Sequence, residues 1–152
     1  MRLLRIIYIS RTSLDAAEAA RELPQILAAS RANNPRCGVT GALMVSPDGF
    51  AQVLEGPATK LGETFERIQC DLRHDDVTIL SFEPLTERQF GDWSMACCDG
   101  AEALCEAGLT LGDLAERGAG GVQPMLDLLH GALAAQDQRS RLLGAGSSGH
   151  AT

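Results

Sequence analysis

Short apolar runs and longer helical stripes alternate along residues 1–98 of the chain. Residues 3–9 are rich in branched side chains and predict a buried strand, whereas apolar positions recur at helical spacing from Ala16 to Leu27. The elements predicted after these are strand, strand, helix, strand and strand, at 38–45, 50–54, 61–71, 77–82 and 93–98. This β-α-β-β-α-β order with an added strand predicts an α+β fold of ferredoxin-like type, with both helices on one face of a mixed sheet.

Turn and cap residues set the boundaries of these elements. Thr12 and Asp15 have the spacing of a capping box that begins the first helix, and residues 33–35 (NNP) are expected to end it. Pro24 falls inside this helix, so either the helix kinks there or a stronger helix begins with Pro24 as its first residue. Residues 46–49 (SPDG) have strong turn chemistry and predict a hairpin between the second and third strands.

Beyond Asp99 the apolar pattern becomes helical. Three leucines between 109 and 114 predict one short helix, which the glycine-rich residues 118–121 interrupt. A last helix, from Val122 to about Arg141, carries a continuous apolar stripe. Both helices need an apolar surface to cover, and we expect them to pack on the second face of the sheet. The predicted divisions are a sheet domain at 1–98, a helical extension at 99–143 and a disordered tail at 144–152.

Composition and charge restrict the partners of the chain. With 152 residues, 45% of them apolar, it can build a core. Its net charge of −7 argues against nucleic-acid binding, which needs a broad positive surface. The first 44 residues differ, because they carry six arginines against three acidic residues. Such a basic segment could hold a small phosphorylated ligand, although ordinary solvated arginines are the plainer interpretation.

Apolar runs and cysteines indicate the compartment. No segment reaches the roughly 18 apolar residues of a membrane span, and the apolar run near the start is too short for a signal peptide. We therefore expect a cytoplasmic protein without a membrane partner. Its five cysteines form no C-x-x-C pair and suggest neither a disulfide framework nor a metal site. We interpret them as reduced, mostly buried thiols, with a redox role for the adjacent Cys97 and Cys98 as the alternative.

Two polar residues stand in the middle of predicted strands. Tyr8, the only tyrosine, lies in the first strand. Gln52 lies in the third strand, on the face it shares with Phe50 and Leu54. A buried glutamine amide must find hydrogen-bond partners. Taken alone, Gln52 is most simply a structural hydrogen bond or a partly exposed position, and the asparagines at 33–34 are most simply helix caps.

Four segments taken together resemble the BLUF family, the flavin-binding blue-light sensor domains. Residues 31–41 (RANNPRCGVTG) match one segment of the family, and residues 50–57 (FAQVLEGP) match its glutamine-bearing strand. Residues 92–95 (DWSM) look like the family's Trp/Met-bearing segment, and Tyr8 stands in its N-terminal strand. The order and spacing of all four agree, and the resemblance covers about residues 1–98.

The resemblance implies a non-covalently bound flavin, FAD with FMN as the alternative, between the two helices of the sheet domain. Asn34 matches the family residue that pairs with the C4=O and N3–H side of the ring. Arg67 matches a position that reaches the C2=O side, and Asn33 and Arg31 are expected to help hold the ring or the phosphate tail. Gln52 completes these contacts. Neutral amides suit the mixed polar edge of the ring, because each amide both donates and accepts.

The resemblance also implies the photochemistry. Tyr8 is expected to give an electron and a proton to the excited flavin and to regain them. Gln52 is expected to bridge the Tyr8 hydroxyl and flavin N5/C4=O, and its amide ends rearranged, by rotation or tautomerism, with a small red shift of absorption. Trp93 and Met95 share a strand face and are expected to pass this change to the sheet; ordinary core packing is the alternative for both.

These assignments imply a blue-light photoreceptor and not an enzyme. We expect the helical extension to read out the change and the signal to pass to a protein partner or through a homo-oligomer. One alternative is a small acyl-phosphate hydrolase using a loop arginine and an asparagine, but the chain offers no glycine-rich phosphate loop beside them. The other is an interaction module of the same fold that no longer binds flavin.

Overall fold

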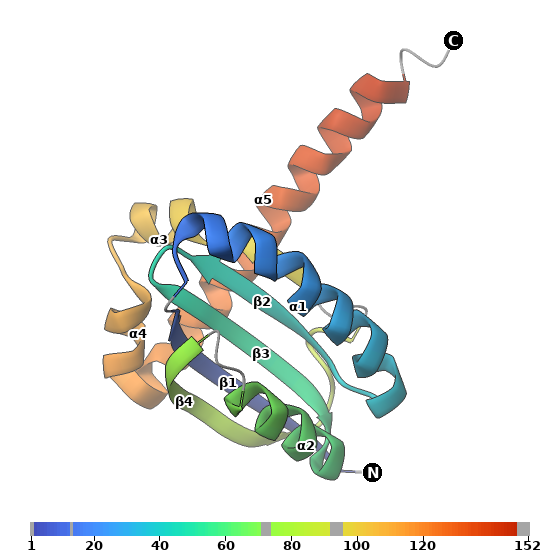
Figure 1. Ribbon diagram of the computed structural model, residues 1–152, viewed down its shortest axis with the longest axis vertical. Coiled ribbons are helices and arrows are strands. Elements are labelled where there is room, and N and C mark those ends of the chain that lie inside the picture. The colour runs from blue at the N-terminus through green and yellow to red at the C-terminus, as the bar shows by residue number, and fades with distance from the viewer. Residues whose placement is uncertain (1, 13, 71–73, 92–95, 149–152) are drawn as a thin grey trace.

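A computed structural model of the chain describes residues 2–12, 14–70, 74–91 and 96–148. Its centre is a five-stranded sheet in the order β4-β1-β3-β2-β5 (Figure 1). Neighbouring strands are antiparallel except β2 and β5, which run parallel, so the sheet is mixed as predicted. The strands are β1 (Leu3–Thr12), β2 (Thr40–Ser46), β3 (Gly49–Pro57), β4 (His74–Leu85) and β5 (Ala96–Asp99).

Two helices, α1 (Ala16–Cys37) and α2 (Ala58–Gln69), cover one face of the sheet (Figure 1). Their apolar stripes pack on the alternate residues of β1 and β3 that point to this face. The buried members of this cluster are Ile6, Tyr8, Val39, Leu43, Phe50, Leu54, Leu61 and Phe65. The predicted ferredoxin-like arrangement is therefore confirmed, and it places Tyr8 on the same face as both helices.

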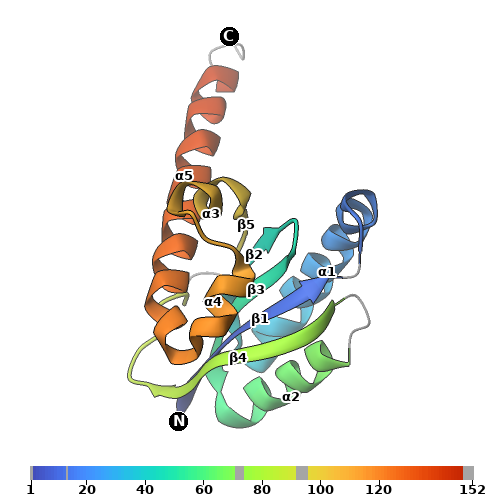
Figure 2. The same cartoon turned by 90° about the vertical axis from the view of Figure 1, so that its left-hand side faces the viewer.

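The opposite face is covered by the C-terminal helices (Figure 2). These are α3 (Ala101–Ala107), α4 (Leu111–Arg117), the 3-10 turn η1 (Gly118–Gly121) and α5 (Val122–Ser148). Ile7 and Ile9 of β1 face this layer, where they join a core that includes Leu114, Met125 and Leu129. A helical cover on the second face is thus confirmed, although it is built from three α-helices where we predicted two.

The ends of α1 differ from the prediction. Asp15 is the N-cap and forms the capping box with Glu18, because its side chain accepts from the Glu18 amide at 2.8 Å. Thr12 instead accepts from the backbone N–H of Leu14. The helix neither begins at Pro24 nor ends at residues 33–35: it continues to Cys37. Gly38 ends it in the left-handed conformation, at φ 67°, where a residue without Cβ is favoured.

The C-terminal boundaries also differ. The helix α3 was not predicted, because its apolar positions are mostly alanines and give a weak stripe. The helix α5 extends to Ser148, beyond the predicted end at Arg141, so residues 144–148 are helical and not the predicted disordered tail. Glycines in this stretch disfavour a helix by only about 1 kcal/mol each, which is insufficient to end one. Across the described residues, no helix combines the length and the apolar character needed to cross a membrane.

Candidate functional site

Tyr8 and Gln52 lie directly opposite each other on the neighbouring strands β1 and β3. Their exposed fractions are 3% and 5%, and the Tyr8 hydroxyl donates a hydrogen bond to Gln52 Oε1. The Tyr8 ring also packs against Phe65 of α2, with ring centroids 5.6 Å apart. The one tyrosine of the chain and the buried mid-strand amide are therefore partners, on the sheet face that α1 and α2 cover.

A pocket of about 260 Å³ opens beside Gln52, between α1 and α2 and over β3. Asn34 and Gln52 bring amides to it, Ile26, Leu54 and Ile68 provide apolar walls, and the other lining residues are Ala29, Ser30, Asn33, Thr64 and Arg67. Tyr8 is not among the lining residues and reaches the pocket through Gln52. Apolar walls with buried amides suit a flat heteroaromatic ring that carries both donors and acceptors on one edge.

The way in which α1 ends positions Asn34 in the pocket. Asn34 lies in the last turn, 3% exposed, and its backbone carbonyl accepts from the N–H of Val39 at 2.9 Å. The left-handed Gly38 makes this return of the chain possible. The neighbouring Asn33 is half-buried and lines the same pocket. Both asparagines singled out from the sequence are thus at the pocket.

Arg67 stands at the exposed side of the pocket on α2. Its Nη2 donates to Thr64 Oγ1 at 3.3 Å, and that hydroxyl in turn donates to the carbonyl of Lys60 at 2.9 Å. Thr64 is buried and lines the pocket, but the sequence analysis missed it. The sequence feature that could have identified Thr64 is its position three residues before Arg67, because this spacing puts the two side chains on one helix face.

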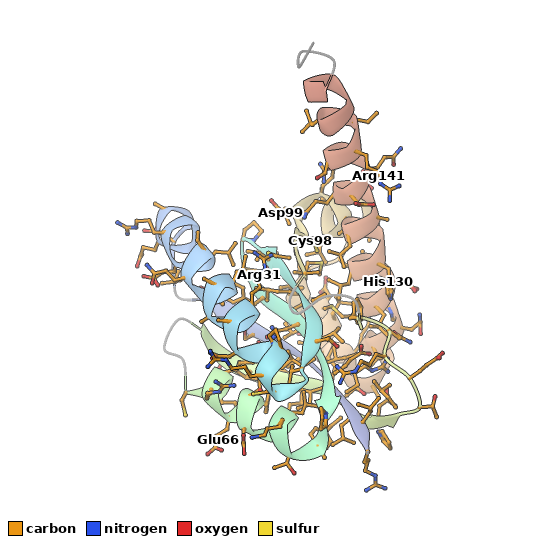
Figure 3. The ribbon with its side chains drawn as sticks, turned by 90° about the vertical axis from the view of Figure 1, so that its right-hand side faces the viewer. Arg31, Glu66, Cys98, Asp99, His130 and Arg141 are labelled. Carbon is orange, nitrogen blue, oxygen red and sulfur yellow. The ribbon has the colours of Figure 1, made fainter. Side chains whose placement is uncertain are left out.

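Arg31 is not among the residues that line this pocket. Its side chain is exposed. Burial raises the pKa of Cys97 on β5, and the nearby charge of Arg31 offsets part of this rise. Figure 3 shows Arg31 on the side of α1 that is nearer to Cys98 and Asp99. Arg31 therefore does not line the pocket shared by the two asparagines and Gln52, and its expected role toward the phosphate tail stays a prediction.

Trp93 and Met95 lie outside the described residues, but the residues on either side of them contact α5. Phe90, 1% exposed, stacks on the His130 ring with centroids 4.9 Å apart and planes 8° apart. On the other side, the carbonyl of Cys97 accepts from Gln136 Nε2 at 2.8 Å. The two ends of this segment are therefore both attached to one helix of the opposite layer.

Glu55 is a fully buried carboxylate that the sequence analysis did not single out as functional. Its Oε1 accepts from the backbone N–H of Gln89 at 2.9 Å and of Phe90 at 2.7 Å. Arg88 adds hydrogen bonds to the carbonyls of Glu55 and Gly38. The segment after β4 is thereby fastened to β3, three residues along the strand from Gln52, and to the end of α1.

The cysteines offer no reactive thiolate in the sheet. Burial raises the pKa of the Cys98 thiol to about 12, and burial also raises the pKa of Cys97. Both therefore stay protonated near neutral pH, which disfavours the redox role considered for this pair. All five cysteines are free, and no group of side chains able to hold a metal ion occurs among the described residues.

A second pocket, of about 420 Å³, lies near the other end of α1. It is larger and mainly apolar, and its walls include Leu23, Val45, Phe50 and Cys98. Neither Asn34 nor Gln52 lines it. Because a mixed donor and acceptor edge needs buried amides, the smaller pocket is the better match for the chemistry predicted from the sequence.

Comparisons with known proteins identify the family of the chain. The model of the BLUF family, described as sensors of blue-light using FAD, matches residues 3–96. The photoactivated adenylate cyclase subunit beta of Euglena gracilis is 33% identical over 93 residues, which are 61% of this chain and 11% of that protein. The chain therefore spans only a small part of the cyclase that it matches.

Solved structures show the same likeness. The dark-state structure of BlrB, a BLUF protein, is 33% identical with a TM-score of 0.70, and the match covers 89% of this chain and 97% of that one. The ground state of BlsA shares the fold, with 24% identity and a TM-score of 0.73 over 84% of this chain and 87% of that one.

Proposed function

Because the chain belongs to the BLUF family of blue-light sensors that use FAD, we propose that it is a blue-light photoreceptor. In this proposal FAD binds non-covalently in the pocket between α1 and α2, and light rearranges a hydrogen-bond network of Tyr8, Gln52 and the ring. One observation carries the proposal above the others: the Tyr8 hydroxyl donates to the amide of Gln52, which itself lines the pocket.

The residues of the pocket fit the ring. Asn34 offers both a donor and an acceptor to the C4=O and N3–H side, and Gln52 offers the same to N5 and C4=O. In this proposal Arg67, at the exposed side, donates to C2=O. Ile26 and Ile68 contribute apolar surface from the two helices. The ring contacts are common to FAD and FMN; we propose FAD, for which the family is named.

Tyr8 and Gln52 carry the light response in this proposal. Bound flavin supplies a strong oxidant when it absorbs blue light. Tyr8 is the phenol that gives up an electron and a proton and takes them back. Gln52 accepts from Tyr8 through Oε1, and an amide that accepts at oxygen donates at nitrogen, so one side chain can bond both the phenol and a ring acceptor. Rotation of the amide, which exchanges its oxygen and nitrogen, or tautomerism, which moves a proton from the nitrogen to the oxygen, changes the hydrogen bond offered to C4=O.

We propose that the change then reaches α5. Trp93 and Met95 are the residues we expect to move, and the chain on either side of them is held to α5 through Phe90–His130 and Cys97–Gln136. A displaced segment would therefore pull on α5 at two places. In this proposal the chain senses without catalysing a reaction and signals to a protein partner in the cytoplasm, where its free cysteines stay reduced.

The test is the colour and spectrum of the purified full chain. We expect a yellow protein, or one that binds added FAD with one flavin per chain, and a small reversible red shift after a blue flash. A colourless preparation that ignores FAD and FMN would overturn the proposal and favour the flavin-free interaction module. A yellow protein with no reversible shift would overturn the photoreceptor role while leaving flavin binding in place.

A further inference from the structure

The outer part of α5 extends beyond the rest of the molecule (Figures 1 and 2). Residues 134–143 are all exposed, and among them Leu142 and Leu143 are 68% and 74% exposed. A helix derives most of its stability from packing an apolar face against other elements. Two neighbouring leucines in solvent at the end of an unpacked helix therefore indicate a surface that another molecule covers.

A groove of about 830 Å³ runs beside this helix, between α3 and α5. Its lining includes the small residues Ala103, Ala107 and Ala135 beside the larger Leu128. Gly131 also lines it, and a Cβ added at Gly131 would meet no atom within 4 Å. Small lining residues let the backbone of another helix approach closely, so the groove can accommodate a helix.

Acidic residues outnumber basic ones in the groove, whereas basic residues outnumber acidic ones on the outer part of α5. The groove is lined by the exposed carboxylates of Asp99, Glu102, Glu106 and Asp127 and by Arg139. Among the exposed residues 134–143 of this part of α5, Arg139 and Arg141 are basic and Asp137 is acidic (Figure 3 labels Arg141). The pairs these arginines make within the chain are exposed, at 3.9 Å to Glu102 and 3.1 Å to Asp137. Exposed pairs of this kind are weak and can be exchanged for others.

We propose that the occupant of this groove is a second copy of the same chain. Leu128, Gly131, Ala135, Arg139 and Leu142 all line the groove, so they lie along one face of α5. Leu128 and Leu142 are equally far from Ala135 along the helix, as are Gly131 and Arg139. A two-fold axis near Ala135 would therefore place Leu128 of one copy beside Leu142 of the other, and Gly131 of one copy beside Arg139 of the other. The result is an isologous dimer with antiparallel α5 helices.

In this alignment the outer helix of each copy complements the groove of the other copy in both charge and shape. The partner copy's outer helix would set its apolar face on Leu128, and its arginine at position 139 over Gly131. The glycine leaves room for that side chain, and the carboxylates of Glu106 and Asp127 line the same groove. Each copy contributes one basic helix end and one acidic groove, so the contact closes on itself and does not propagate. This inference does not depend on flavin binding.

The test is the mass of the full chain in solution, measured in the dark by sedimentation equilibrium over a range of concentrations. We expect a dimer. Gly131→Arg adds bulk and a positive charge in the groove, and we expect the dimer dissociation constant to rise roughly tenfold or more. Gly62→Arg is the matched control, because a Cβ at Gly62 of α2 also meets no atom within 4 Å. The control should dimerise like the wild type. Both variants should have a melting temperature equal to or above that of the wild type.

A charge exchange tests the alignment itself. Arg139→Glu should weaken the dimer, and adding Glu106→Arg in the same chain should restore it at least in part. A monomeric wild-type chain at every concentration would overturn the proposal and leave the groove to a different protein. A dimer that Gly131→Arg leaves as strong as the control would overturn it as well, because the contact would then lie elsewhere.

Discussion

Tyr8 of β1 and Gln52 of β3 are a directly opposed cross-strand pair, and the phenol donates to the amide. Their positions follow from the register of two strands buried on both faces. A slip of one residue would turn every side chain of a strand to the other face, so this register is strongly specified. This register holds the only phenol of the chain and a side-chain amide together on the sheet face that α1 and α2 cover.

Gln52→Leu should leave the fold and flavin binding largely intact and abolish the red shift. Leucine has a similar size, and its neighbours Phe50 and Leu54 belong to the apolar cluster of this sheet face. It lacks the amide that links Tyr8 to the ring. Light-minus-dark absorption spectra check this, with Gln69→Leu at the exposed end of α2 as the control. A normal red shift in Gln52→Leu would exclude the amide from the switch.

Asn34→Ala should weaken FAD binding by about tenfold, the effect of losing one or two hydrogen bonds to the ring edge. Asn34 is buried and lines the pocket, whereas Gln25 on the same helix is exposed and does not line it. Quenching of flavin fluorescence during titration measures the affinities of both alanine variants. Equal affinities for Asn34→Ala and Gln25→Ala would show that the ring does not lie against Asn34.

Local patterns predict the sheet domain because its boundaries are encoded locally. The SPDG sequence at 46–49 forms the expected hairpin, closed by the pairing of Ser46 with Gly49. Strand alternation correctly puts Gln52 on the face of Phe50 and Leu54. That Tyr8 is directly opposite Gln52 cannot be found in this way, because β1 and β3 are far apart in the chain and only their register decides it.

The errors have equally specific causes. The end of α1 was placed at the asparagines and Pro35, but the backbone turns only at Gly38, where a positive φ is needed. Glu55 stands in an apolar strand without any local sign of its partners, the N–H groups of Gln89 and Phe90. Such contacts between distant segments depend on tertiary packing, and single-sequence patterns do not contain them.

Glu55→Gln should lower the free energy of unfolding by about 1–3 kcal/mol, because both carboxyl oxygens accept from buried backbone N–H groups and the amide nitrogen of glutamine cannot accept. Urea unfolding measures the loss, and faster amide exchange at Gln89 and Phe90 would locate it. Glu63→Gln is the control, since Glu63 is exposed on α2 and pairs only weakly with Lys60 at 3.5 Å. Equal stability of the two variants would contradict the role given to Glu55.

Glu83 on β4 should contribute stability that depends on pH. The hydrogen bond from the buried Arg5 side chain holds the pKa of the Glu83 carboxyl below its ordinary value of 4.5. A lowered pKa means that the contribution is complete above pH 4.5 and is lost as the pH falls through the folded-state value. Glu83 is 46% exposed, so the effect should not exceed about 1 kcal/mol.

Urea midpoints of the wild type and Glu83→Gln test this dependence. The wild type should be the more stable at pH 7, and the difference should shrink at successive pH values below 4.5. A difference that stays constant, or that grows as the pH falls, would show that the ion pair with Arg5 is not its source.

The central claim is that the Tyr8 hydroxyl, acting through Gln52, makes the bound flavin responsive to light. The most direct measurement is the light-minus-dark spectrum of the flavin-loaded wild type beside Tyr8→Phe, which keeps the ring packed against Phe65 and removes only the hydroxyl. We predict that both proteins bind flavin and that only the wild type shows the reversible red shift. A full red shift in Tyr8→Phe would contradict the account.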